Sequence, residues 1–378
     1  MEIKMVDLKN QYLRIKDEIR KSVDEVLFSS QYIKGRQVEE FEQSLKEYLG
    51  VRYAITCANG TDALQIALMS LDLKPNDEVI CPSFSFIASA EVIALLGLRP
   101  VFVDVDYNNF NTTAKNIKQA ISIKTKAIIV VHLFGQSAEM EEILSIAKQY
   151  NLYVIEDNAQ SFGAESIFSD GSAKKLGTIG NIGCTSFFPT KNLACYGDGG
   201  AIFTDDDILA EKLRMIANHG SKQKYNSQRI GVNSRLDTLQ AAILQVKLKY
   251  LDQYLKKRQE VANIYNNELK NLEQIILPSK SPNSTHTFNQ YTIKVMEKKR
   301  NDLQTYLKSK NIPTAIYYPI ALHKQTALSL VSRKGNEMTN TDRLCSEVLS
   351  LPMHTELSIE QQKYITENIK QFFIQEKK

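Results

Sequence analysis

The chain has no recognisable targeting or membrane-crossing segment. Residues 1–20 are polar and mixed in charge, without the basic stretch and apolar core of a secretory signal. The longest apolar run, residues 87–98, is interrupted by Glu91 and is too short to cross a bilayer. We therefore expect no membrane partner.

Cysteine is sparse, odd in number and scattered. No CxxC pair and no Cys/His ligand spacing occurs, which argues against a disulfide framework and against a metal site. A reducing cytoplasm is the expected location. The five cysteines are Cys57, Cys81, Cys184, Cys195 and Cys345.

A strong charge of one sign is also missing. The net charge is only +4 and is evenly spread, so we expect no nucleic-acid partner. No GxGxxG run follows an early strand, which argues against a nicotinamide-dependent sugar oxidoreductase. With 43% hydrophobic and 24% charged residues, the composition is typical of a soluble globular protein.

The length of 378 residues fits a large domain followed by a smaller one. Short apolar runs alternate with helical patterns, which predicts an α/β fold with a mostly parallel sheet covered by helices. We predict a large domain over residues 1–250, with N-terminal helices at 10–27 and 37–48, and a small α+β domain over 251–378. Strands are expected at 53–57, 78–81, 100–103, 126–131, 153–156, 184–187, 201–204 and 290–295. Further helices are expected at 61–70, 87–96, 113–121, 140–149, 302–309 and 359–372, with one long helical stretch from 236 to 272.

Ligands of such sheets bind beyond the carboxyl ends of the strands, and two early segments fall there. Residues 57–64 read Cys-Ala-Asn-Gly-Thr-Asp-Ala-Leu, where a helix start around Gly60 and Thr61 could cradle a phosphate. Ordinary helix capping is the alternative. Residues 154–160 read Val-Ile-Glu-Asp-Asn-Ala-Gln. Asp157 could hold the pyridinium proton of pyridoxal 5′-phosphate (PLP), and Gln160 could bind the phenolic oxygen, unless Asp157 caps the next helix.

Two later segments complete the pattern. Lys191 stands in an apolar stretch, 185–193, followed by Gly-Asp-Gly-Gly; burial would lower its pKa and favour the neutral amine that forms a Schiff base. Ser186 could donate to the phosphate, while a surface loop is the alternative for Lys191. Asn233 and Arg235 precede a helix rich in Leu, Ala and Ile, where capping and packing are the alternatives. Together the four segments supply a phosphate cradle, a ring-nitrogen acid, a Schiff-base lysine and an anion-binding corner.

These motifs resemble the DegT/DnrJ/StrS family of sugar aminotransferases, from residues 6–9 to residues 351–354 of the chain. The resemblance implies fold type I of PLP-dependent transferases, the aspartate aminotransferase-like fold, and a homodimer with shared active sites. It implies catalytic roles for Lys191 and Asp157. The implied cofactor-binding residues are Gly60, Thr61, Phe86 (stacked on PLP), Asp157, Gln160, Ser186, Lys191 and Asn233 (reaching from the other subunit). The implied substrate-binding residues are Arg235, Tyr317, Tyr318 and His323. For Phe86 core packing is the alternative, and for Tyr318 and His323 a surface loop.

Within the family, the chain is most similar to UDP-2-acetamido-2-deoxy-3-keto-glucuronate aminotransferases, which take the amino group from L-glutamate. This similarity implies C3 amination of a keto-sugar nucleotide for surface polysaccharide such as lipopolysaccharide. Tyr317 departs from the pattern, because those relatives tend to carry His there, and a tyrosine is common in members acting on 6-deoxy sugars. A 3-keto- or 4-keto-6-deoxy sugar on UDP or dTDP is thus the alternative substrate. A non-catalytic regulatory member could lack the lysine or the aspartate, and this sequence has both.

Overall fold

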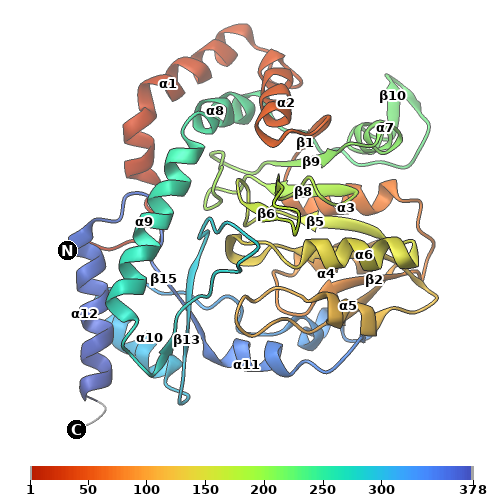
Figure 1. Cartoon of the computed structure of the whole chain (residues 1–378). Helices are drawn as coiled ribbons and strands as arrows, with labels where there is room; N and C mark the ends of the chain where they lie inside the picture. The colour runs from red at the N-terminus through yellow and green to blue at the C-terminus, as the bar shows by residue number, and fades with distance from the viewer. Residues whose placement is uncertain (1, 376–378) are drawn as a thin grey trace.

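An eight-stranded sheet runs through the centre of the computed structural model, which describes residues 2–375 (Figure 1). The strand order is β1-β9-β8-β5-β4-β2-β3-β14. From β14 to β8 every neighbouring pair is parallel, and only β9 runs antiparallel to β8 and to β1. This confirms the mostly parallel sheet. The strands are β1 (Tyr53–Cys57), β2 (Glu78–Pro82), β3 (Arg99–Val103), β4 (Thr125–Val131), β5 (Tyr153–Asp157), β8 (Ile182–Ser186), β9 (Gly200–Thr204) and β14 (Arg333–Lys334).

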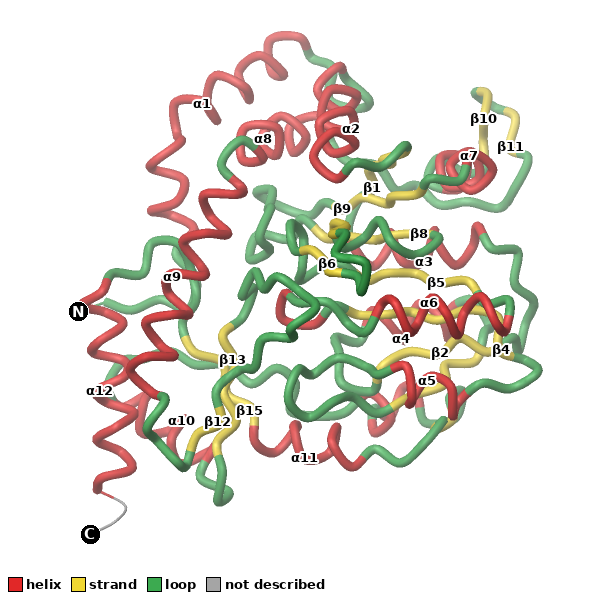
Figure 2. Tube along the Cα trace, in the orientation of Figure 1, coloured by secondary structure: helices red, strands yellow, loops and turns green. Residues whose placement is uncertain are grey.

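Helices cover both faces of this sheet, which explains why its strands are apolar along most of their length (Figure 2). One face packs against α3 (Gly60–Ser70), α4 (Ala88–Leu95) and α7 (Asp207–Ile216). The other packs against α5 (Ala114–Ala120) and α6 (Met140–Tyr150). Each crossover between parallel strands therefore begins at the carboxyl edge of the sheet, where the candidate residues are expected.

Two long helices at the N-terminus, α1 (Leu8–Ser29) and α2 (Arg36–Leu49), pack on α8 (Thr238–Leu248). The single helical stretch predicted from residue 236 to 272 is wrong. The chain turns between α8 and α9 (Leu251–Leu269), although no glycine or proline marks the turn. The periodicity continues across this break because both helices bury an apolar face, so the pattern carries no stop signal.

A second sheet of three strands lies beside the first and has its own core. Three elements here, β12, α11 and β15, were not predicted. The core takes Ile3 from the N-terminal segment, and α9 contributes to it through Val261 and later residues. The domain boundary at residue 250 stays a prediction. The elements of this region are β12 (Ile275–Ile276), β13 (Tyr291–Val295), α10 (Arg300–Ser309), α11 (Thr339–Glu347), β15 (Val348–Leu351) and α12 (Ile359–Gln375).

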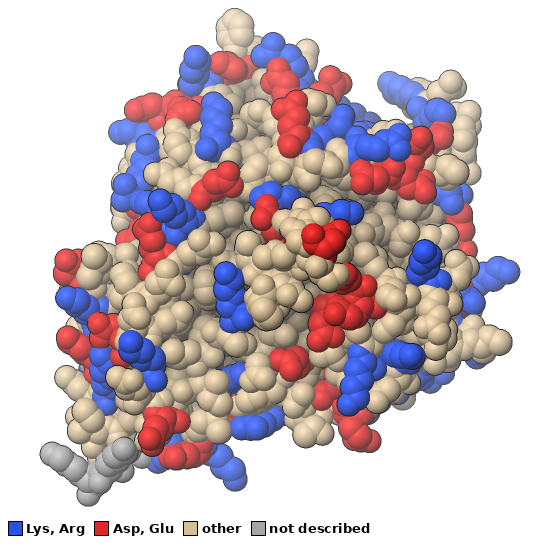
Figure 3. Space-filling view, viewed as in Figure 1, with Lys and Arg blue, Asp and Glu red and all other residues tan. Residues whose placement is uncertain are grey.

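The visible surface carries lysine and arginine interspersed with aspartate and glutamate, as Figure 3 shows. This mixture agrees with the small net charge of +4. Across residues 2–375, none of the helices has both the length and the apolar character needed to cross a bilayer.

Candidate active site

The strand register brings three of the sequence segments to one edge of the sheet. Cys57 of β1 is opposite Gly200 of β9, and Gly200 is in turn opposite Ser186 of β8. Asp157 of β5 pairs with Cys184 of β8. The loops that follow these strands therefore start within a few strand widths of one another.

The start of α3 is built against the end of β8. Asn59 caps the helix, its side-chain oxygen accepting the amide hydrogen of Asp62 at 2.8 Å. The amides of Gly60 and Thr61 have no acceptor among the described residues. A Cβ on Gly60 would lie 2.7 Å from Cβ and 3.3 Å from Oγ of Ser186, so only glycine lets the hydroxyl approach this helix start. Free amides beside a hydroxyl at a helix N-terminus are a ready site for a phosphate.

The loop that carries Lys191 is held in place at several points. Cys195 donates its amide hydrogen to the Phe187 carbonyl at 2.9 Å, which closes the loop on itself. Asn192, buried beside Lys191, donates to the Thr287 hydroxyl at 2.9 Å. On the other side, Gln240 of α8 bonds both the N–H (2.8 Å) and the carbonyl (3.2 Å) of Tyr196. The lysine is thus fixed by contacts from both halves of the chain.

Lys191 and Asp157 interact electrostatically in this arrangement. Burial lowers the pKa of Lys191, and the charge of Asp157 raises it part of the way back. Burial likewise raises the pKa of Asp157. The amide of Ala159 and the charge of Lys191 lower this pKa, but they offset the effect of burial only in part. A buried amine with a depressed pKa is a nucleophile and a base, and a nearby carboxylate can accept a hydrogen bond from a protonated ring nitrogen.

Gln160 connects this pair to a cluster of aromatic rings. Its oxygen accepts the amide hydrogen of Phe134 at 2.9 Å, and its nitrogen donates to the Tyr318 hydroxyl at 3.0 Å. The Phe86 ring lies 6.4 Å from the Tyr318 ring and is 56% exposed, so core packing does not account for Phe86. An exposed ring beside Gln160 and Asp157 leaves one aromatic face open to a flat ligand.

The remaining predicted substrate residues are less closely grouped. Tyr317 is half-buried next to Tyr318, with 5.9 Å between ring centroids. The side chain of His323 is 2% exposed, which contradicts a surface loop, and Nδ1 lies 2.6 Å from the Ser83 hydroxyl. The Nε2 atom of His323 lies 3.4 Å from Asp342, so both ring nitrogens face protein groups.

Among the residues that the structure describes, no hydrogen bond or ion pair joins Asn233 or Arg235 to Lys191 or Asp157. Asn233 is exposed, and Arg235 lines a cavity of about 570 Å³ together with Lys34, Glu42 and Arg214. None of the other predicted site residues lines that cavity. Ser234, which lies between Asn233 and Arg235, accepts the amide hydrogen of Ala58 at 3.0 Å, so this segment lies against the turn that leads to Gly60.

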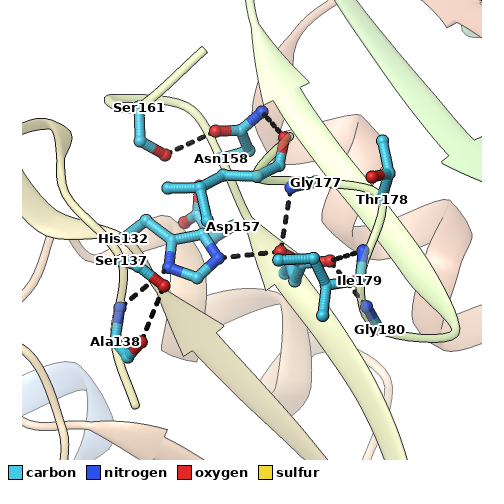
Figure 4. Close-up of polar contacts among 12 residues, drawn as sticks. His132, Ser137, Ala138, Asp157, Asn158, Ser161, Gly177, Thr178, Ile179 and Gly180 are labelled. Carbon is cyan, nitrogen blue, oxygen red and sulfur yellow. Dashed lines mark hydrogen bonds and ion pairs between the residues drawn. The ribbon is translucent and has the colours of Figure 1, made fainter. Parts of the chain in front are cut away.

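Two buried residues behind Asp157 were missed by the sequence patterns. Glu156 and His132 are both fully buried, with 2.9 Å between Glu156 Oε2 and His132 Nε2 (Figure 4). A charged residue inside the apolar strand Tyr-Val-Ile-Glu-Asp was the available signal, because a buried carboxylate requires partners.

The residues present fit PLP. Unpaired amides and a hydroxyl at the start of α3 suit its phosphate, and the buried Asp157 suits its ring nitrogen. The depressed pKa of Lys191 suits bonding to its aldehyde.

A family model described as the DegT/DnrJ/EryC1/StrS aminotransferase family matches residues 13–370. The chain belongs to this family. Membership confirms the fold, the aminotransferase class and the PLP cofactor that the resemblance implied.

Individual relatives of this aminotransferase cover nearly its whole length. It is 46% identical to the UDP-2-acetamido-2-deoxy-3-oxo-D-glucuronate aminotransferase of Pseudomonas aeruginosa, over 93% of this chain and 95% of that one. It is 44% identical to a pleiotropic regulatory protein of Geobacillus stearothermophilus, over 99% of both. The solved structure of NtdA from Bacillus subtilis with bound cofactor PMP superposes with a TM-score of 0.85 at 34% identity, covering 94% of this chain and 81% of that one.

Proposed function

We propose that this protein transfers the amino group of L-glutamate to C3 of a UDP-linked 2-acetamido-2-deoxy-3-keto-glucuronate, with Lys191 and Asp157 as its catalytic residues. The observation that carries this proposal is that Lys191, in the loop after β8, and the buried Asp157, at the end of the neighbouring β5, are close enough for each charge to affect the pKa of the other. The similarity to the Pseudomonas enzyme supports the choice of substrate.

The cofactor, when bound, supplies an aromatic system that takes up negative charge from the substrate carbon. Asp157 holds the proton on the ring nitrogen, and Gln160 donates to the phenolic oxygen. Lys191, whose pKa burial lowers, takes the proton from the amino-acid carbon and later returns a proton to the sugar carbon. The amides of Gly60 and Thr61 and the Ser186 hydroxyl bind the phosphate, while Phe86 covers a ring face.

We further propose a homodimer with shared sites, in which Asn233 and Arg235 act in the site of the other subunit. This is supported by the exposure of Asn233 and by the lack of a hydrogen bond or ion pair from either side chain to Lys191 or Asp157 among the described residues. In the dimer, the partner subunit's Asn233 would contact the phosphate. Arg235 would then supply the positive charge for an anionic sugar or diphosphate, with Tyr317, Tyr318 and His323 near the sugar. We place the enzyme in the cytoplasm, in a pathway of surface polysaccharide synthesis.

Tyr317 favours the second candidate substrate, a 3-keto- or 4-keto-6-deoxy sugar on UDP or dTDP. A tyrosine at this position offers a ring and a hydroxyl but no positive charge for a carboxylate at C6. The two candidate substrates differ in that carboxylate. The selectivity of the enzyme between them therefore depends on whether Arg235 or another cation binds the carboxylate.

The test begins with the cofactor. The purified protein should absorb visible light, and borohydride should bleach that absorbance and leave the cofactor covalently attached at Lys191 by peptide mapping. Glutamate-dependent amination should then be assayed against a panel of keto-sugar nucleotides. Attachment elsewhere than at Lys191 would contradict the catalytic assignment, and exclusive turnover of 6-deoxy sugars would replace the uronate.

The similarity to a pleiotropic regulatory protein favours a further candidate, a regulatory family member. Such a protein would need neither the amine nor the carboxylate. Glutamate turnover that disappears in Lys191→Ala separates enzyme from regulator, whereas a lack of turnover with every keto-sugar would favour regulation.

A further inference from the structure

Behind Asp157, on the same strand, lies a carboxylate that the mechanism does not use. Glu156 is 0% exposed. Its Oε1 accepts the amide hydrogens of Ile179 at 2.6 Å and Gly180 at 2.7 Å, and its Oε2 accepts that of Gly177 at 2.8 Å. In Figure 4 these contacts converge on one side chain together with the ring of His132.

These donors keep Glu156 ionised. Burial alone would raise the pKa of Glu156, but the hydrogen bond from His132 and the amides of Gly180 and Gly177 lower it below its ordinary value. A carboxylate that accepts several N–H groups is stable as an anion even where water is excluded.

The ring of His132 does not neutralise this charge. Its Nδ1 accepts the amide hydrogen of Ala138 at 3.2 Å, so the ring proton must be on Nε2, where it is donated to Glu156. A second ring proton would put two donors, Nδ1–H and the Ala138 amide, against each other. The pair of His132 and Glu156 therefore carries a net negative charge.

His132 also links this pair to Asp157 directly. Its backbone amide donates to the Asp157 carbonyl at 3.1 Å, across the neighbouring ends of β4 and β5. Glu156 and Asp157 are consecutive in β5, so their side chains leave the strand on opposite faces. Charges this deeply buried are weakly screened, and one affects the other across the strand.

We propose that Glu156 and His132 are positioning residues for Asp157, and that the fixed negative charge of the pair favours a protonated cofactor ring nitrogen at Asp157. This rests on the proposed function of Asp157. The pair fixes the strand end from which the Asp157 carboxylate extends. It also adds a second anion behind that carboxylate, which disfavours loss of the proton that the ring nitrogen shares with Asp157.

Other titratable groups also face Asp157 and affect the protonation of the ring nitrogen at that site. Lys191 approaches from the loop after β8, and Tyr318 from the segment that bonds Gln160. Cys184 lies beside Asp157 on β8, with a thiol pKa that burial and the carboxylate raise. Glu156→Gln leaves all three in place and removes the charge behind the strand, together with the acceptor that one carboxylate oxygen offers to Gly177 and His132.

The experiment uses holoenzyme reconstituted with PLP that carries ¹⁵N in its ring. Nitrogen NMR across a pH series reports the protonation of that atom in the wild type, in Glu156→Gln and in Glu78→Gln. Glu78 is the matched control, because it is also a buried carboxylate. It is the first residue of β2, at the edge of the sheet away from Asp157, and Arg333 and Ser122 donate hydrogen bonds to it. In Glu156→Gln we expect deprotonation at least about one pH unit lower, a tenfold change in the equilibrium constant. In Glu78→Gln we expect none.

A purely structural role predicts a different result. It would lower the thermal midpoint of Glu156→Gln and leave the ring-nitrogen titration unchanged, which would overturn the proposal. If Glu156→Gln does not fold, the wild-type holoenzyme still decides. Nitrogen NMR of the His132 ring should show hydrogen on Nε2 alone, as its contacts require, and a doubly protonated ring would refute the argument. Absence of cofactor at Lys191 in the wild type would instead overturn the proposed function.

Discussion

Replacing Gly60 with alanine tests the phosphate site at a single atom. The added Cβ would lie 2.7 Å from Cβ of Ser186, whereas ordinary contact begins at 3.4 Å, so the two groups must separate by about 0.7 Å. After such a shift, the Ser186 hydroxyl and the first amides of α3 can no longer bind the same phosphate together. Losing one hydrogen bond to a charged group costs roughly 1.5–3 kcal/mol, so the dissociation constant for PLP should rise roughly 10- to 150-fold.

The affinity can be measured by equilibrium dialysis of the cofactor-free protein, with cofactor absorbance as the signal, because the chain contains no tryptophan. Ser186→Ala removes the hydroxyl without a clash, and its dissociation constant for PLP should rise by an amount at the lower end of that range. Gly171→Ala is the control: its Cβ would meet nothing within 4 Å, although its φ of +83° makes alanine strained there. Unchanged affinity in Gly60→Ala, with the fold intact, would refute the phosphate cradle.

Three further predictions concern charges. Asp157→Asn should keep PLP bound but lower kcat by on the order of 10²–10³ in steady-state assays, and near-normal turnover would contradict its role. The rate at which cofactor-free protein captures PLP should rise with pH, because Lys191 reacts as the neutral amine, and its midpoint should lie below 10.5; a midpoint at or above 10.5 would mean that burial does not depress this pKa. Burial lowers the pKa of Lys247 to about 8 from 10.5, so the protonated side chain destabilises the fold at neutral pH, by about 3 kcal/mol. Lys247→Met should therefore be more stable than the wild type in denaturant titrations at pH 7, with a difference that shrinks as pH rises from 8 to 10.5, and a pH-independent difference would contradict this.

The regular parts of the fold could be predicted because local pattern and tertiary structure agree there. β1 is predicted to the residue, and α2, ended by Gly50 in the left-handed conformation, is within one residue at each end. The elements that were missed depend on distant partners. Arg333 and Lys334 form β14 only because they pair with β3, and β15 needs β13 beside it.

The same distinction applies to the site. Asp157, Lys191 and Gly60 follow strands or begin helices, so the order of elements places them at one edge of the sheet. The contact between Gln160 and Tyr318 joins residues 158 positions apart, and no local pattern encodes it. The resemblance to a known family supplied Tyr318, but not its hydrogen bond. His132 and Glu156 were passed over because their pairing depends on the turn that carries Gly177 and Gly180.

Ile3, near the beginning of the chain, is buried in the core formed with Ile365, Ile369 and Phe373 of the last helix. The segment around Ile3 therefore has no permanent place until α12, which is synthesised much later, is available to pack against it. Contacts between residues so distant in sequence form slowly during folding. This region should be among the last to become protected during refolding, and an early-synthesised apolar segment waiting for its partner is a natural client for a chaperone.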